Sequence, residues 1–198
     1  MNTQHNKIFT EYRSKESNYW EQPNNVEMLR YVLDCDEVII NEGITESDFH
    51  LGCDAVAKKM YRHKNMLHPI SHSVSLRTRY NSNYLDINFR NNIKNPLSEI
   101  RKILSYFDVN STYAKYFVQC FDVSNNKAKF CVKWQTSDIA KYVYSVIEHL
   151  PNYYKESTKR YDIPVSEAVS FNAVIYDLSG DKPLEVNYDY IVDNYRSK

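Results

Sequence analysis

From residue 116 to residue 135, apolar and polar residues alternate along the chain on both sides of the pair Asn125-Asn126. Two asparagines between alternating segments are typical of a two-residue β-hairpin turn, because asparagine tolerates the left-handed backbone that this turn requires. The turn sets the register of the two strands and pairs Phe117 with Trp134 on an almost wholly apolar face. A slip of one residue would turn these side chains to the other face, so the pattern predicts one hairpin in one register.

The same period of two predicts two further hairpins. Residues 73–90 alternate as two strands that are expected to fold back near Ser82, with their apolar residues on one face. Residues 169–190 are expected to form the third hairpin, around a turn that contains Gly180 and Pro183. Each hairpin is therefore expected to present one apolar and one polar face.

Apolar residues at helical spacing predict helices before and between these hairpins. The predicted helices span residues 25–33, 46–62, 97–107 and 136–150. Asn95 and Pro96 are a typical start for the third helix, and Pro151 is expected to stop the fourth.

Helices and hairpins in this order predict an α+β fold. We expect an antiparallel sheet built from three hairpins, with helices packed on one face and water on the other, preceded by two N-terminal helices. The length of 198 residues favours a single domain, here residues 25–198. Residues 1–24 are polar with a few aromatic side chains and are interpreted as an N-terminal arm that docks on this domain.

The composition excludes several classes of protein. The 25 Lys and Arg residues balance the 25 Asp and Glu residues, whereas proteins that wrap duplex nucleic acid are usually clearly basic. With only three glycines, the chain lacks the clustered glycines of phosphate-binding loops. No cofactor is therefore expected.

The composition also bears on the compartment. The four cysteines are scattered and form no Cys-x-x-Cys motif, which favours a reducing cytoplasm. The first residues lack the apolar stretch of a signal peptide, and no apolar run is long enough to span a membrane, so no membrane partner is expected. Abundant asparagine and 18 tyrosines are typical of an AT-rich genome, such as that of a phage or another mobile element, which would place the protein in a host cytoplasm.

Two clusters have residue types that chemistry could use. Zinc accepts histidine and cysteine in principle, and four such residues follow one another: Cys53, His63, His68 and His72. Their spacing matches no zinc motif and Pro69 interrupts it, so a solvated loop without metal is expected. His50 and Asp54 stand four apart on the predicted second helix, where they could begin a general base or form an exposed ion pair; the ion pair is favoured.

In the predicted register of the central hairpin, Cys120 faces Cys131. Cysteines in such directly opposed positions lie within the range that a disulfide tolerates. Because a reducing compartment is favoured, two free thiols are expected here.

Aromatic and basic residues towards the C-terminus could form a protein-binding surface. The candidates are Tyr153, Tyr154, Arg160, Tyr161, Tyr188 and Tyr190. Exposed tyrosine and arginine are the residue types that anchor protein interfaces. We expect Tyr153, Tyr154 and Tyr161 to be at least partly exposed.

A second candidate surface is the polar face of the predicted sheet. Its basic residues are Arg77, Arg79, Arg90, Lys127, Lys129 and Lys133. Basic residues interleaved with aromatic rings on a sheet can hold single-stranded nucleic acid. The alternative is that neighbouring aspartates neutralise this face.

The leading hypothesis from the sequence is a non-enzymatic protein of the accessory, inhibitor or assembly type. Its partner would be another protein or a second copy of the chain. The first alternative is a nucleic-acid-binding protein that uses the basic sheet face, and the second is a small hydrolase-type or metal-dependent enzyme.

Overall fold

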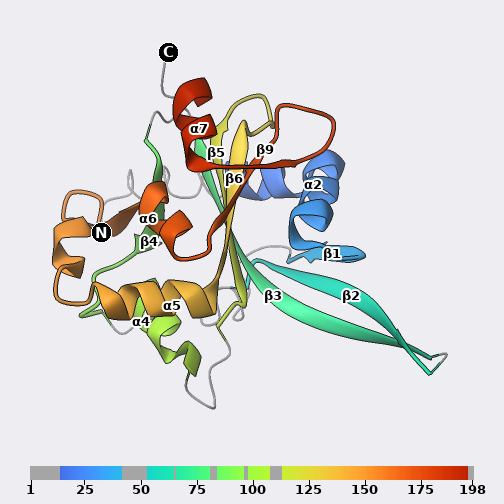
Figure 1. Cartoon of the computed structure of the whole chain (residues 1–198), viewed down its shortest axis with the longest axis horizontal. Helices are drawn as coiled ribbons and strands as arrows, with labels where there is room; N and C mark the ends of the chain where they lie inside the picture. The colour runs from blue at the N-terminus through green and yellow to red at the C-terminus, as the bar shows by residue number, and fades with distance from the viewer. Residues whose placement is uncertain are drawn as a thin grey trace.

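The structure is a computed structural model that describes residues 14–41, 53–64, 66–80, 84–95, 98–107 and 113–195. Its fold is α+β, as the sequence predicts: helices surround a large, mostly antiparallel sheet, and a second, smaller sheet lies beside it (Figure 1). The first part of the helix predicted at residues 46–62, up to residue 52, and the predicted turn at residues 81–83 lie outside the described residues.

The large sheet has seven strands in the order β1-β2-β3-β5-β6-β9-β10. Their bounds are β1 (Glu37–Ile40), β2 (Ala55–His63), β3 (Met66–Tyr80), β5 (Tyr116–Val123), β6 (Phe130–Gln135), β9 (Val174–Asp177) and β10 (Leu184–Val186). All neighbours are antiparallel except β3 and β5, which run parallel. The smaller sheet has the order β4-β8-β7, with β4 (Asp86–Arg90), β8 (Arg160–Pro164) and β7 (Tyr154–Lys155).

Helices and the smaller sheet cover the two faces of the large sheet separately. On one face pack α2 (Pro23–Leu33) and the helical residues 14–20, which bury Tyr19 and Trp20. The other face is covered by β4, β8, α4 (Glu99–Leu104), η1 (Ser105–Phe107), α5 (Thr136–Ser145), η2 (Leu150–Tyr153), α6 (Val165–Ser170) and α7 (Tyr188–Tyr195). Figure 1 shows α2 on the opposite side of the sheet from α5 and α6.

The expected water-covered face is therefore absent from the centre of the sheet. Side chains of β5 alternate between two cores: Phe117 and Phe121 enter the first, and Val118 and Cys120 the second. The central strands are apolar on both faces, and such strands are buried on both sides. The face that holds Cys120 is the one that the sequence analysis expects to be polar.

The central hairpin, β5–β6, has the predicted register. Phe117 pairs with Trp134, and Cys120 pairs with Cys131. Asn125 and Asn126 have φ values of 48° and 58°, so both residues adopt the left-handed conformation of the predicted turn. The thiols of Cys120 and Cys131 are free, as expected.

Replacing Asn126 should show how much this turn contributes. Because Asn126 has a positive φ, we expect Asn126→Ala to be less stable than Asn126→Gly by about 1 kcal/mol, since only glycine adopts this conformation without steric cost. Urea denaturation of the two variants measures the difference. Equal stabilities would mean that the turn does not hold this conformation in solution.

The other two predicted hairpins differ from the structure. β3 does not pair with β4: it lies between β2 and β5, and β4 joins the smaller sheet beside β8. Residues 55–62, predicted as part of a helix, form β2 instead. Ala55 and Ala57 are buried and alternate with less buried residues, a period of two that the helical spacing of larger side chains conceals.

In the third predicted hairpin, β9 and β10 pair as expected but are shorter. Residues 169 and 170 belong to α6, while Tyr188 and Tyr190 belong to α7 rather than to a strand. Asn187 explains the change, because its side-chain oxygen accepts a hydrogen bond from the backbone N–H of Tyr190 at 2.8 Å, as a helix N-cap does.

Two predicted helices are confirmed with small differences at their ends. The helix predicted from residue 97 appears as α4 followed by η1. The helix predicted to reach Pro151 is α5, which ends at Ser145 and is followed by turns and η2.

Candidate binding interface

Strands β2 and β3 continue beyond the body of the sheet. β1 pairs with β2 only as far as Lys58, and β5 pairs with β3 only from Val74. Residues 59–63 and 66–70 pair with each other as a two-stranded ribbon that projects from the body (Figure 1). We call these two segments and Lys64 the free ribbon.

The hydrogen-bonding pattern explains how the free ribbon accommodates Pro69. Pro69 faces Met60, whose backbone N–H points away from β3 and donates to the Oδ2 atom of Asp36 at 2.6 Å. The two residues are therefore a non-hydrogen-bonded pair, in which the ladder needs no N–H from Pro69.

The C-terminal end of α2 fixes the base of the free ribbon. The Asp34 carboxylate forms an ion pair with Lys59, and the neighbouring Asp36 accepts the hydrogen bond from Met60. Glu37 adds an ion pair to Lys58, with 3.1 Å between Nζ and Oε2. The acidic residues after α2 thus hold the first part of the ribbon.

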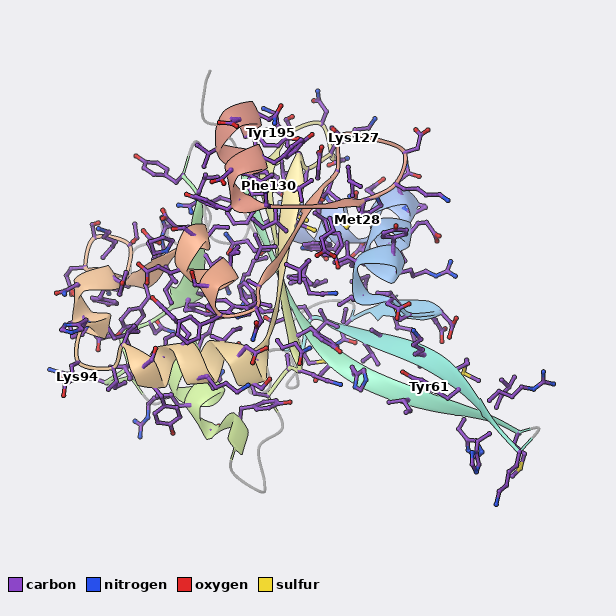
Figure 2. All side chains as sticks on the ribbon, viewed as in Figure 1. Met28, Tyr61, Lys94, Lys127, Phe130 and Tyr195 are labelled. Atoms are coloured by element: carbon purple, nitrogen blue, oxygen red, sulfur yellow. The ribbon has the colours of Figure 1, made fainter. Side chains whose placement is uncertain are left out.

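Large apolar side chains are exposed on both faces of the free ribbon. Directly paired residues point to the same face, so Tyr61, Met66 and Ile70 share one face, while Met60 and Leu67 share the other. All five are exposed, Met66 by 60% and Leu67 by 63%. Figure 2 shows Tyr61 on the ribbon, and its side chain also lines the pocket at the ribbon's base. A two-stranded ribbon is marginal alone in water, and clustered exposed apolar residues mark contact sites.

The free ribbon is also basic. It contains Lys59, Arg62 and Lys64 together with His63 and His68, and the sequence has no acidic residue from position 55 to position 85. Arg62 and Lys64 are both exposed near the tip. The ribbon therefore presents a surface that is apolar and positively charged at once.

The structure separates the three histidines of the predicted cluster. The rings of His63 and His68 lie 6.4 Å apart, whereas His72 lies at the base, with its Nε2 atom 3.1 Å from Nζ of Lys115. Burial and the charge of Lys115 lower the pKa of His72. Within the described residues, no group of three or more potential ligands is placed to hold a metal ion.

The other residues considered for catalysis are Asp54 with His50 and the thiol of Cys35. Asp54 accepts hydrogen bonds from the backbone N–H of Leu76 at 2.6 Å and from the Arg77 guanidinium at 3.0 Å, and His50 lies outside the described residues. A pocket at the base of the ribbon contains Cys35 beside His72. Burial raises the pKa of the Cys35 thiol, which is the opposite of what a nucleophilic cysteine needs.

The six basic residues predicted to share one sheet face are separated. Arg77 and Arg79 lie between the two sheets, where Arg77 pairs with Glu99 and Arg79 donates to the backbone oxygen of Asp86 at 2.8 Å. Lys133 is on the opposite face of the large sheet and donates to the backbone oxygen of Val32 at 2.8 Å.

The remaining three basic residues lie apart from these. Arg90 approaches Glu16, Lys129 pairs with Asp122, and Lys127 is exposed in the central hairpin turn. The expectation of one open basic face is wrong because β3 and β4 belong to different sheets.

The predicted tyrosine surface is partly buried. Tyr153 and Tyr154 are half-buried, as expected, but Tyr161 is fully buried and its ring lies 5.0 Å from that of Tyr154. Tyr188 is half-buried, and Arg160 pairs with Asp162.

Several tyrosine hydroxyls serve hydrogen bonds within the fold. Glu167 accepts from Tyr142 and Tyr153. Asp177 accepts from Tyr190 and from Tyr195, each at 2.7 Å, which ties α7 to β9. Burial alone would raise the pKa of Asp177, but the hydrogen bonds from Tyr190, Ser179 and Tyr195 outweigh it, and the pKa is lowered.

The fold and the ribbon define an α+β protein with a projecting, basic and apolar β-ribbon. Comparison with protein-family models, with curated proteins and with solved structures gives no match to this chain. No helix in the described part of the chain is long and apolar enough to cross a membrane. Any functional conclusion therefore rests on the residues and the geometry described above.

Proposed function

We propose that this chain is a non-enzymatic protein-binding protein, of the accessory or assembly type, and that the free ribbon is its contact element. The observation that carries the proposal is the exposure of five large apolar side chains on a projecting ribbon: Met60, Tyr61, Met66, Leu67 and Ile70. Methionine, tyrosine and arginine are enriched in protein interfaces, and the ribbon has all three.

The free energy gained when apolar side chains are buried favours a ribbon that is covered by a partner. Burial of one large apolar side chain contributes about 1.5–3 kcal/mol relative to its exposed state. Met66 and Leu67 point to opposite faces at the tip, so a partner that covers the tip can contact both. The sequence hypothesis of a tyrosine-based interface finds less support, because Tyr161 is buried and the hydroxyls of Tyr153 and Tyr190 donate hydrogen bonds within the fold.

Capture of partners with matched variants tests the proposal. We expect a Met66→Ser/Leu67→Ser variant to lose, under nuclease treatment, a protein that the wild-type chain captures from its native lysate. Both residues are exposed, so the free energy of unfolding should stay within about 0.5 kcal/mol of the wild-type value.

The control is Tyr144→Ser/Ile147→Ser, because these residues are also exposed but lie at and beyond the end of α5, away from the ribbon. It should retain the captured protein. A partner that binds the ribbon variant as well as the wild type would contradict the ribbon's role.

The charge of the ribbon favours nucleic acid as a second candidate partner. A two-stranded β-ribbon fits the major groove of DNA, and the free ribbon has three lysine or arginine residues without an acidic one. Fluorescence polarisation with a labelled duplex at two salt concentrations tests this candidate. Phosphate contacts require an affinity that falls steeply with salt, and absence of binding at low salt would eliminate it.

A reducing cytoplasm is the compartment in which we expect the protein to act. The four free thiols support this expectation. If the chain comes from a phage or another mobile element, as its composition favours, the compartment is the cytoplasm of the host.

A further inference from the structure

The opposite edge of the large sheet, formed by β10, has exposed acidic residues, which the free ribbon lacks. β10 is the last strand of the sheet and pairs only with β9 among the described strands. Asp181, Glu185 and Asp189 are exposed in and around β10 and at the start of α7, and with the exposed Lys182 this stretch has three acidic residues against one basic residue. Leu184, 61% exposed, and Tyr190 lie among them. We call the three acidic residues together with Leu184 and Tyr190 the acidic edge.

We propose that the free ribbon of one copy docks on the acidic edge of a second copy. This inference rests on the proposed function and names the partner. The ribbon has Arg62 and Lys64 near exposed Met66 and Leu67. The acidic edge offers Glu185 on one face of β10 and exposed Leu184 on the other, followed by Asp189 and Tyr190 at the start of α7. Each surface thus supplies the charge and the apolar contact that the other needs.

The charge distribution along the chain agrees with this pairing. The whole chain is neutral, but the free ribbon holds three of the lysine and arginine residues and no acidic residue. The rest of the chain therefore has 22 basic residues against 25 acidic ones. The part of a second copy outside its ribbon is therefore net acidic and attracts the basic ribbon.

The two surfaces cannot meet within one chain. The ribbon continues β2 and β3 near one edge of the sheet, and β10 forms the other edge. In Figure 1 the ribbon points to the lower right, away from α7 at the top of the view. Because the contact joins two different surfaces, its repetition gives either a closed ring, of which a two-fold dimer with two reciprocal contacts is the smallest, or an open filament.

Charge reversal on each side tests the inference. The ribbon variant is Arg62→Glu/Lys64→Glu, and the edge variant is Glu185→Lys/Asp189→Lys. Sedimentation velocity should show that the wild type associates with increasing concentration and that salt weakens this association. Each variant alone should associate at least about 100-fold more weakly, because like charges then face each other.

Mixing the two variants gives the decisive result. In the mixture, the acidic ribbon of one variant meets the basic edge of the other, and the unchanged surfaces also complement each other, so association should return. The control Lys94→Glu/Lys127→Glu makes the same change in net charge as the ribbon variant, but at two exposed lysines of the body, labelled in Figure 2. It should associate like the wild type.

The outcomes separate this inference from the proposed function. A wild type that stays monomeric up to about 100 µM, or variants that do not associate when mixed, would overturn docking between copies. If capture of another protein still depends on Met66 and Leu67, the protein-binding function stands with a different partner. If capture is independent of the ribbon as well, both proposals fail.

Discussion

Arg77→Met is expected to lower the free energy of unfolding by about 3–5 kcal/mol, because it leaves Glu99 without its charge partner in the interior. The guanidinium pairs with Glu99 of α4 and with Asp54, and the Arg77 side chain is largely buried. The charges of Glu99 and Asp54 outweigh the effect of burial, which alone would lower the pKa of Arg77, and they raise it well above its ordinary value. Urea denaturation measures the loss.

The matched control is Arg30→Met. Arg30 forms an ion pair with Glu27 on the exposed side of α2, at 2.7 Å between Nη1 and Oε2. Exposed pairs contribute about 0–1 kcal/mol, so this variant should lose far less stability. Equal losses for the two variants would mean that the interior ion pair does not form. Arg77→Met/Glu99→Leu should recover part of the loss, because no unpaired charge from this pair then remains buried.

The same ion pair predicts a dependence on pH. Burial alone would raise the pKa of Glu99, but the charges of Arg77 and Arg90 and their hydrogen bonds outweigh it, so the pKa lies below the ordinary value of 4.5. The carboxylate therefore adds stability that is fully present above pH 4.5 and is lost as the pH falls through the lowered pKa. The wild type should lose stability over this range more steeply than Glu99→Gln.

Trp134→Ala is expected to cost about 3–5 kcal/mol, because it removes the largest fully buried side chain and leaves a cavity. Trp134 lies on β6, its indole N–H donates to the backbone oxygen of Phe171 at 2.8 Å, and its ring lies 5.7 Å from that of Tyr142. Calorimetry or urea denaturation provides the measurement.

Two comparisons sharpen this result. Trp134→Phe keeps most of the apolar contact but leaves the Phe171 oxygen without its hydrogen bond, so its loss should be smaller than that of Trp134→Ala. Tyr144→Ala removes a ring that is exposed on α5 and should change stability by no more than about 0.5 kcal/mol. A loss for Trp134→Ala as small as that of Tyr144→Ala would contradict the packing between β6 and α5.

The parts of the fold that could be predicted are those that a local pattern in the sequence specifies. The β5–β6 register follows from alternation around Asn125-Asn126, and α2 follows from an apolar stripe that is buried against the sheet. Pairing between distant strands could not be predicted, because no local pattern states that β3 runs beside β5 or that β4 lies beside β8.

The free ribbon escaped prediction for a physical reason. Alternation arises where one face of a strand is buried, but Met60 and Leu67 are exposed on one face of the ribbon while Tyr61 and Met66 are exposed on the other. Its apolar residues therefore follow no period of two. The available signal is the run without acidic residues from position 55 to position 85, together with Pro69 in a strand that continues outside the sheet.

The tyrosine and arginine candidates show a further limit. Their residue types suggest exposed surface, but their acceptors, such as Glu167 for Tyr153 and Glu99 for Arg77, are distant in the sequence. Burial of a polar side chain depends on whether such a partner is near, and this is decided only when the elements pack.

β3 is a continuous strand of 15 residues, which corresponds to about 50 Å of extended chain. Its inner half lies in the sheet and bears Arg77, and its outer half forms one side of the free ribbon. A sideways force on the tip is therefore transmitted along β3 to the part of the strand that lies in the sheet. The direction in which the ribbon points therefore depends on the packing of β3 around Arg77 as well as on Asp34 and Asp36 at its base, so substitutions around Arg77 are expected to shift a surface that they do not touch.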